Sequence, residues 1–310
     1  MKPLSLFAML LIFAGCFPDV SEVSPPKFTE ISGSISGTLT LKDAPYHVTD
    51  TLLVDANVTL AIEPAVRLFF ADSALMIVKG QLTAIGDASR FIEFSDIDGQ
   101  WKGIKFVTGS GRSQMRFCIV EEVYVEGQNS LQISAIEVHQ STLNIQNCII
   151  RNNHSGFGGG LYCTGSNVTL TNSIIRDNFA ETFGGAVLCD DSQAQINNNT
   201  ILNNLSFNYG GGVVLVNPLA VEIQNNIFYR NSNSTGDPRI ALRTGDSTNL
   251  TAQFNFLALP GLNPGFESDA DLHLTSVSPC KDAGNPDASF RDVDGSRNDQ
   301  GAYGGLLGDW

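Results

Sequence analysis

One seven-residue motif occurs four times in this chain, and its spacing restricts the fold more than any other feature. The copies begin at Asn147, Asn172, Asn198 and Asn225, so they are separated by 25, 26 and 27 residues. A fixed period of this length is typical of a solenoid, in which each repeat forms one coil that cannot bury its apolar face alone. Glycine clusters follow three of the copies, at 158–160, 184–185 and 210–212.

The repeats have the composition of strands and turns. Their apolar residues alternate or occur in twos and threes, and no i, i+3, i+4, i+7 pattern is sustained. Asn, Gly, Ser and Asp separate the short β-branched runs, as expected for strands joined by turns. We therefore predict an all-β fold, a single-stranded parallel β-helix whose coils stack about 4.8 Å apart.

Two asparagine positions recur in the same register of every copy. Asn is tolerated in left-handed turn conformations, and its amide can bond to the same amide one coil away. The pattern predicts that equivalent asparagines stack at turns. The two sets are Asn147, Asn172, Asn198 and Asn225, and Asn153, Asn178, Asn204 and Asn231.

Further segments carry a resemblance to a known fold family. The segments 58–70 and 101–106 resemble early coils of right-handed parallel β-helix proteins, the pectate-lyase-like superfamily, although Ala65 stands where that family usually has Gly. The Asn and Gly-Gly-Ala repeats resemble the polymorphic outer-membrane protein repeats. The resemblance implies right-handed coiling with N- and C-terminal caps. It places roughly nine coils over 31–256 and a C-terminal cap over 257–310.

The first residues predict export. Lys2 precedes an apolar run from Leu4 to Ala14, which is too short for a permanent membrane span and is typical of a signal peptide over 1–15. The small residues before Cys16 resemble the bacterial lipoprotein box, which implies a lipid on Cys16 and a tether over 16–30. We expect a chain anchored in the bacterial cell envelope, at the outer membrane or cell surface. Ordinary signal cleavage with an incidental Cys16 is the alternative.

The formal net charge of −14 limits the partners. An acidic surface disfavours nucleic acids and anionic polymers, including polygalacturonate unless calcium bridges the charges. We expect a monomer whose partners are the membrane, through the lipid, and a polysaccharide or cell-surface glycan.

The cysteines leave two readings open. Cys163 and Cys189 share one register, and the runs that begin at Cys118 and Cys148 match at 30 residues. Each pair is expected to stack on adjacent coils, either as a disulfide or as buried free thiols in a core ladder. Cys280 has no obvious partner.

Candidate catalytic residues are few. Glu137 and His139 are outward positions of one predicted strand and could form an acid/base pair, and Asp190-Asp191 resembles one fragment of the polygalacturonase pattern. A glycoside hydrolase needs clustered carboxylates, and a lyase needs a base near acidic residues. The low number of charges on this face favours binding over catalysis.

Aromatic residues precede the glycine clusters. Phe157, Phe183 and Tyr209 are 26 residues apart and could form a strip that stacks on sugar rings, with Tyr162 in the next strand beside it. The alternative is that these rings fold over a coil edge and cover the core.

The tail holds a candidate calcium site. Asp292, Asp294 and Asp299 place several oxygen ligands in one turn, and calcium prefers such ligands. A metal-free turn with Arg297 paired to an Asp is the alternative, and no other cofactor is expected.

The sequence therefore predicts a non-catalytic surface lipoprotein that binds glycan or serves adhesion. The alternative is a carbohydrate-active enzyme, a polysaccharide lyase or glycoside hydrolase, that uses the outward strand face. A purely structural surface protein is a third reading.

Overall fold

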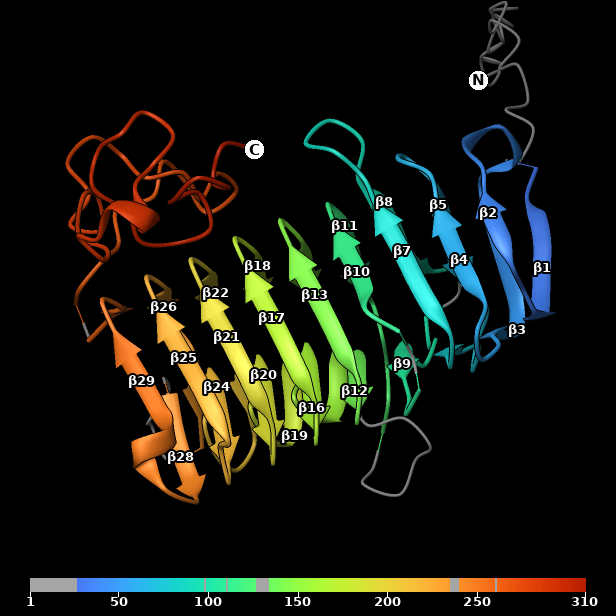
Figure 1. Ribbon diagram of the computed structural model, residues 1–310, viewed down its shortest axis with the longest axis horizontal. Helices are drawn as coiled ribbons and strands as arrows, with labels where there is room; N and C mark the ends of the chain where they lie inside the picture. Colours follow the sequence, from blue (N-terminus) through green and yellow to red (C-terminus); the bar gives the residue numbers. More distant parts are fainter. Residues whose placement is uncertain (1–26, 98, 110, 127–133, 235–239, 260) are drawn as a thin grey trace, which may run out of the picture.

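A computed structural model describes residues 27–97, 99–109, 111–126, 134–234, 240–259 and 261–310, and these form a parallel β-solenoid (Figure 1). The described ranges hold no α-helix and only three short 3-10 helices, η1 (Leu41–Asp43), η2 (Ser247–Asn249) and η3 (Ala288–Phe290). The all-β parallel solenoid predicted from the repeat is confirmed.

Each coil contributes strands to three faces, and every strand pairs in parallel with its equivalent in the next coil. The faces are numbered here in chain order within a coil. The second face is a sheet of nine strands, which corresponds to about eight turns of the solenoid, close to the predicted number of coils. Its strands are β2 (Gly37–Leu39), β4 (Thr59–Ile62), β7 (Gln81–Ile85), β10 (Ser113–Arg116), β13 (Thr142–Gln146), β17 (Asn167–Thr171), β21 (Gln193–Asn197), β25 (Ala220–Gln224) and β29 (Leu250–Gln253).

The first and third faces are joined through one long strand. β3 (Tyr46–Val54) pairs with β1 (Thr29–Ser34) and also with the first strand of each face. The first face consists of β6 (Met76–Val78), β9 (Ile104–Phe106), β12 (Ile136–His139), β16 (Leu161–Thr164), β20 (Val187–Asp190), β24 (Val213–Val216) and β28 (Ile240–Thr244). The third face consists of β5 (Arg67–Phe70), β8 (Ile92–Asp96), β11 (Cys118–Glu121), β14 (Ile149–Arg151), β18 (Ile174–Arg176), β22 (Thr200–Leu202), β26 (Ile227–Tyr229) and β30 (Phe256–Leu257).

A short fourth sheet lies between the third face and the first face of the next coil. It contains β15 (His154–Phe157), β19 (Phe179–Phe183), β23 (Leu205–Ser206) and β27 (Ser232–Asn233). The glycine clusters follow its strands, where the chain turns sharply. A Cβ on Gly185 would lie 2.5 Å from the carbonyl oxygen of Gly211 in the next coil, so only glycine allows the coils to approach this closely.

Inward side chains form in-register ladders that fill the core. Ile136 is opposite Leu161, which is opposite Val187 on the next coil, and all three are buried. The parallel register thus stacks buried apolar residues of successive coils on one another, so that each coil covers the core of its neighbour.

The two asparagine sets have different roles. In the first set every residue has a left-handed backbone, as at Asn147 (φ 52°) and Asn172 (φ 49°). In the second set the side chains are buried and bond to one another: Asn178 Nδ2 donates to Asn204 Oδ1 at 2.9 Å. The predicted register is confirmed, and these amides satisfy backbone carbonyls that would otherwise be buried without partners.

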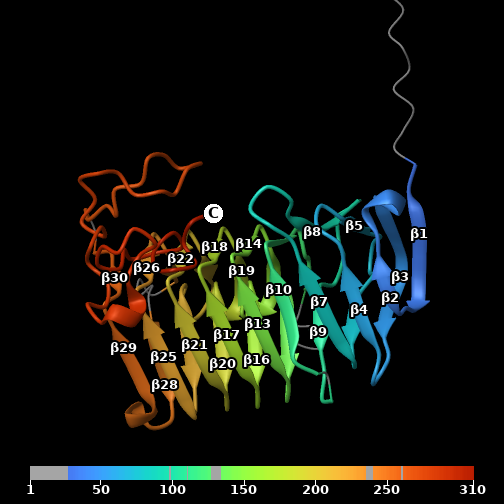
Figure 2. The same ribbon diagram turned by 45° about the horizontal axis from the view of Figure 1, so that its top comes forward.

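The tail from 261 onward runs back along the third face (Figures 1 and 2). Leu272 and Ala302 pack on Ile174 and Leu202, which point outward from β18 and β22. The turn asparagines hold this tail: Asn172 Nδ2 donates to the carbonyl of Gly304 at 2.7 Å. The segment predicted as a C-terminal cap therefore covers one side of several coils.

Candidate functional site

The first face carries one buried ionic cluster. Glu137 on β12 is 1% exposed, and its Oε1 lies 3.1 Å from Nζ of Lys105 on β9. His139 Nε2 contacts the same oxygen. The structure thus brings Glu137 and His139 together, as the sequence suggested, and adds Lys105. The signal for Lys105 was its position one coil before Glu137 in the same outward column.

The other candidate carboxylates lie elsewhere. Asp190 is opposite Thr164, which is opposite His139, so two ladder steps, or roughly 10 Å, separate Asp190 from the cluster. Asp191 occupies a left-handed turn (φ 45°) and is exposed. Of these candidate carboxylates, Glu137 alone belongs to the cluster with Lys105 and His139. Glycoside hydrolysis commonly uses two carboxyl groups that flank the scissile bond, and Asp190 does not join the cluster around Glu137.

The aromatic residues before the glycines form a row along the solenoid axis, here named the loop row. Phe157 is in register with Phe183, with ring centroids 5.9 Å apart, and Phe183 pairs with Tyr209 by an isolated bridge. Tyr209 is 37% exposed and the two phenylalanines are half-buried. Phe157 also approaches Tyr162 on the first face, with centroids 6.5 Å apart. The rings therefore cover part of the first face and present their other side to solvent.

A second aromatic row, here named the strand row, lies on the fourth sheet. The ring of His154 lies between Tyr124 and Phe179, with centroid distances of 4.6 and 4.7 Å. Leu205 continues the row on the next coil and is 43% exposed. This row was not predicted from the sequence. A signal was present for three of its members, because His154, Phe179 and Leu205 each directly follow an asparagine of the buried ladder.

Carboxylates border the strand row. The hydroxyl of Tyr124 donates to Glu126 at 2.5 Å, which raises the pKa of the tyrosine, and Glu181 Oε1 lies 3.4 Å from His154 Nε2. A groove of about 560 Å³ adjoins Tyr124 and His154, and Glu122 is part of its wall. This region combines stacked rings with negative charge.

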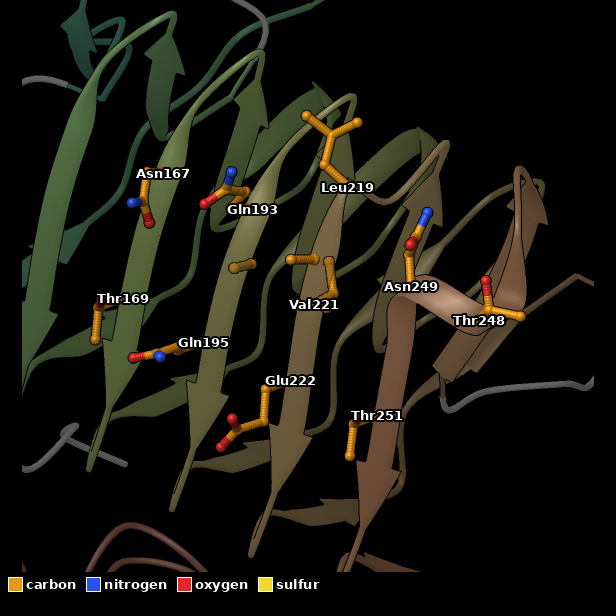
Figure 3. A pocket seen from close by; sticks show the side chains of 12 residues that line it. Asn167, Thr169, Gln193, Gln195, Leu219, Val221, Glu222, Thr248, Asn249 and Thr251 are labelled. Atoms are coloured by element: carbon orange, nitrogen blue, oxygen red, sulfur yellow. The ribbon is translucent and has the colours of Figure 1, made fainter.

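The second face carries a different groove (Figure 3). Asn167, Gln193 and Gln195 point outward from β17 and β21, and η2 stands at the edge of the groove. Of the 12 residues drawn, Glu222 alone carries a charge, and its Oε1 accepts a hydrogen bond from Asn197 Nδ2 at 2.9 Å. The groove offers amides and hydroxyls for hydrogen bonding and has no aromatic ring.

The aspartates of the tail are engaged with their own backbone. Asp292 accepts from the amides of Asp299 and Gly305, and Asp294 Oδ1 accepts from the amide and hydroxyl of Ser296. Burial raises the pKa of Asp292 and of Asp299, whereas the bonds from Ser296 lower the pKa of Asp294. The residues described by the structure contain no cluster of three or more His, Cys, Asp or Glu placed to hold a metal ion. The carboxylates of Asp292 and Asp294 thus accept their hydrogen bonds from groups within the tail itself.

Among the residues that the structure describes, Arg297 has no aspartate within ion-pair distance, in contrast to the ion pair of the metal-free alternative. Its guanidinium instead donates to the carbonyls of Gly284 and Ala283.

The stacked cysteines are free thiols. Cys163 and Cys189 are in register, with Sγ atoms 3.0 Å apart, and the amide of Cys118 lies 3.4 Å from Sγ of Cys148. Burial raises the pKa of the Cys118 and Cys280 thiols. Of the two alternatives predicted for these cysteines, disulfides or buried free thiols, the structure shows the buried free thiols.

Cys16 and the predicted signal peptide over 1–15 lie outside the described residues. Within the ranges that the structure describes, no helix has the length and apolar character needed to cross a membrane.

Comparison with known proteins identifies the fold. Residues 84–256, more than half of the chain, match the family described as right handed beta helix region. No curated protein matches the chain, and no solved structure matches it. The handedness that the resemblance implied agrees with this family.

Proposed function

We propose that this chain, which belongs to the right-handed β-helix family, is a non-catalytic glycan-binding module that serves adhesion at the cell surface. The observation that carries the proposal is the pair of in-register aromatic rows, the loop row and the strand row, on and beside the fourth sheet. Both rows run along the solenoid axis.

The spacing of the rings supports a polymeric ligand. Three successive ring pairs, Tyr124–His154, His154–Phe179 and Phe157–Phe183, have centroids 4.6 to 5.9 Å apart because their residues are on adjacent coils. Each aromatic contact adds roughly 0.5–1.5 kcal/mol beyond its area burial, so a chain that meets several rings gains affinity from many weak contacts. Rings held on β-strands also lose little conformational freedom when they bind.

The alternative function, a carbohydrate-active enzyme, rests on one observation. Glu137 is buried against Lys105 and His139, and a buried carboxylate beside a base is a feature of acid/base sites. The distance to Asp190 weakens this alternative, since a second carboxylate is not at hand. A structural ion-pair cluster accounts for the same contacts.

The binding proposal is tested with a glycan array and one triple variant. Replacing Phe157, Phe183 and Tyr209 by Ala should weaken glycan binding at least tenfold, because each lost contact is worth on the order of 1 kcal/mol. A matched control replaces three exposed leucines at the far end, Leu257, Leu259 and Leu262, by Ala.

Circular dichroism and thermal melting must first show that both variants are folded. A folded aromatic variant that binds as well as the wild type contradicts the proposal. Degradation of a glycan by the wild type, stopped by Glu137→Gln, supports the enzyme instead.

The cellular location is part of the proposal. Export and lipidation at Cys16 would place the module on the outer membrane or cell surface, with 16–30 as a tether. Mass spectrometry of the native protein tests this: the expected mature N-terminus is a lipidated Cys16. An unmodified N-terminus at any other residue contradicts the anchor without affecting the binding proposal.

A further inference from the structure

We propose that the glycan ligand carries protonated amines, and that these amines bind in the groove beside Tyr124 at the start of the strand row. The inference rests on the proposed function and adds the chemical class of the ligand. Aromatic stacking alone selects for sugar rings, whereas the groups around this groove select for charge.

The groove brings rings and carboxylates to one place. Tyr124 and His154 are the first two rings of the strand row, and both belong to the wall of the groove. Glu122 and Asp96 are on the same wall, and Glu122 Oε2 accepts a hydrogen bond from Ser95 Oγ at 3.0 Å. A sugar stacked on Tyr124 therefore has carboxylate oxygens beside it.

Further negative charge surrounds the first rings. Glu126 accepts from the Tyr124 hydroxyl, and Glu181 faces His154. Four carboxylates, counting Asp96 and Glu122, thus border two neighbouring rings.

The nearby cations are engaged. Nζ of Lys102 donates to the carbonyl of Tyr124 at 2.9 Å. Nε of Arg151 lies 2.6 Å from Oε2 of Glu121, a carboxylate outside the groove wall. The carbonyl leaves the charge of Lys102 in place, whereas Arg151 is balanced by Glu121, so four carboxylates face one uncompensated lysine and the charge around the groove is negative.

These surroundings suit an ammonium group. A carboxylate forms charge-assisted hydrogen bonds with an amine, and the face of a tyrosine or phenylalanine ring attracts a cation. The same field repels a uronate or sulfated glycan. The amide groove of the second face has no aromatic ring and a single carboxylate, Glu222, so it provides an internal control surface.

The test compares three hexamers that share a β-1,4 backbone: glucosamine, N-acetylglucosamine and glucose. Titration calorimetry is carried out on the full chain in low salt, at a pH below the pKa of the sugar amine. The glucosamine hexamer should bind about tenfold more tightly than the other two, the effect of one well-placed charged contact. Physiological salt should reduce that advantage because the groove is open to solvent.

Isosteric variants locate the effect. Glu122→Gln combined with Glu126→Gln removes two charges and keeps both hydrogen-bond acceptors, so the protein should remain folded and lose the preference for glucosamine. Glu222→Gln, the matched change on the second face, should leave that preference unchanged.

The outcomes separate the inference from the proposed function. Equal binding of all three hexamers, or a preference that survives in the double variant, overturns the inference and leaves glycan binding intact. Failure of every hexamer and of the array overturns both. A lysine-rich peptide of equal charge that binds more tightly than the glucosamine hexamer also overturns the inference, because the site would then select a basic protein segment.

Discussion

The third face and the fourth sheet both direct apolar side chains outward, but only the third face has a tail of the same chain packed over it. Ile174, Leu202 and Tyr229 point away from the core of the solenoid and pack against the tail. At the fourth sheet, Leu205 on β23 and the residues Phe207 and Tyr209 just after that strand remain 43%, 64% and 37% exposed. Outward apolar residues thus stabilise the fold where the chain covers them. Where they stay exposed in rows, they are the basis of the proposed ligand contact.

The largest expected effect tests this comparison within a single coil. Leu202 is 4% exposed under the tail, whereas Leu205, three residues later, is on the fourth sheet. Leu202→Ala should lower the free energy of unfolding by about 2–4 kcal/mol, because it leaves a cavity between tail and solenoid.

Leu205→Ala is the matched control and should change the stability by no more than about 0.5 kcal/mol. Urea denaturation measures both. Equal losses of stability in the two variants would show that the two surfaces are packed alike.

A smaller effect tests whether the tail can undock from the third face while the solenoid core stays folded. Burial raises the pKa of the Cys280 thiol to about 12, so almost none of it is thiolate at neutral pH. We expect Cys280 to resist alkylation while the tail is docked. Leu202→Ala should accelerate its labelling about tenfold for each 1.4 kcal/mol of docking energy lost.

Peptide mass spectrometry follows this labelling, with Cys118 in the solenoid core as the control. If both cysteines accelerate equally, tail and core open together and the cover is not an independent unit.

The smallest effect is a pH dependence of the tail. Burial raises the pKa of Tyr303 to about 12, and its ring stacks on His273 with centroids 3.7 Å apart. Because the folded pKa lies above the unfolded value of about 10, the contribution of the neutral phenol to stability is complete below pH 10. It is lost as the pH rises to about 12.

Tyr303→Phe should remove this part of the alkaline destabilisation and leave neutral stability nearly unchanged. Urea denaturation of both proteins between about pH 9 and 12 measures it, since this range runs from below the unfolded pKa of Tyr303 up to its folded pKa. Parallel loss of stability in the two proteins would mean that Tyr303 is not the group responsible.

The periodic part of the molecule could be predicted from the sequence, and the aperiodic part could not. The repeat predicted the register because residues such as Asn178 and Asn204 must stack if coils of 26 residues superpose. It also predicted the loop row. The path of the tail has no periodic signal, since it depends on surface complementarity between Leu272 and the outward Ile174 and Leu202. The repeat showed paired isoleucines at 174–175, but it could not say that one faces the core and the other the tail.

The residues of the candidate site likewise divide into those whose proximity the sequence predicted and those whose proximity it did not. Glu137 and His139 lie on one strand, so their proximity followed from sequence spacing alone. Lys105 belongs to an earlier coil separated by an insertion, and its distance in sequence from Glu137 exceeds the repeat length. The strand row was within reach of the repeat pattern, but its first ring, Tyr124, lies outside the copied motif.

The tail has a consequence for how long this solenoid can be. Its residues meet successive coils in reverse order: Gln300 donates to Phe254, Ala302 accepts from Asn172, and Leu307 accepts from Asn147. Trp310 reaches still further, to Phe117. Each of these contacts therefore matches one position in the tail to one particular coil. A repeat protein can usually gain or lose a unit by duplication, since each unit contacts only its neighbours. Here an extra coil between 147 and 254 would shift the coils relative to the tail residues that contact them. The tail therefore favours a fixed number of coils.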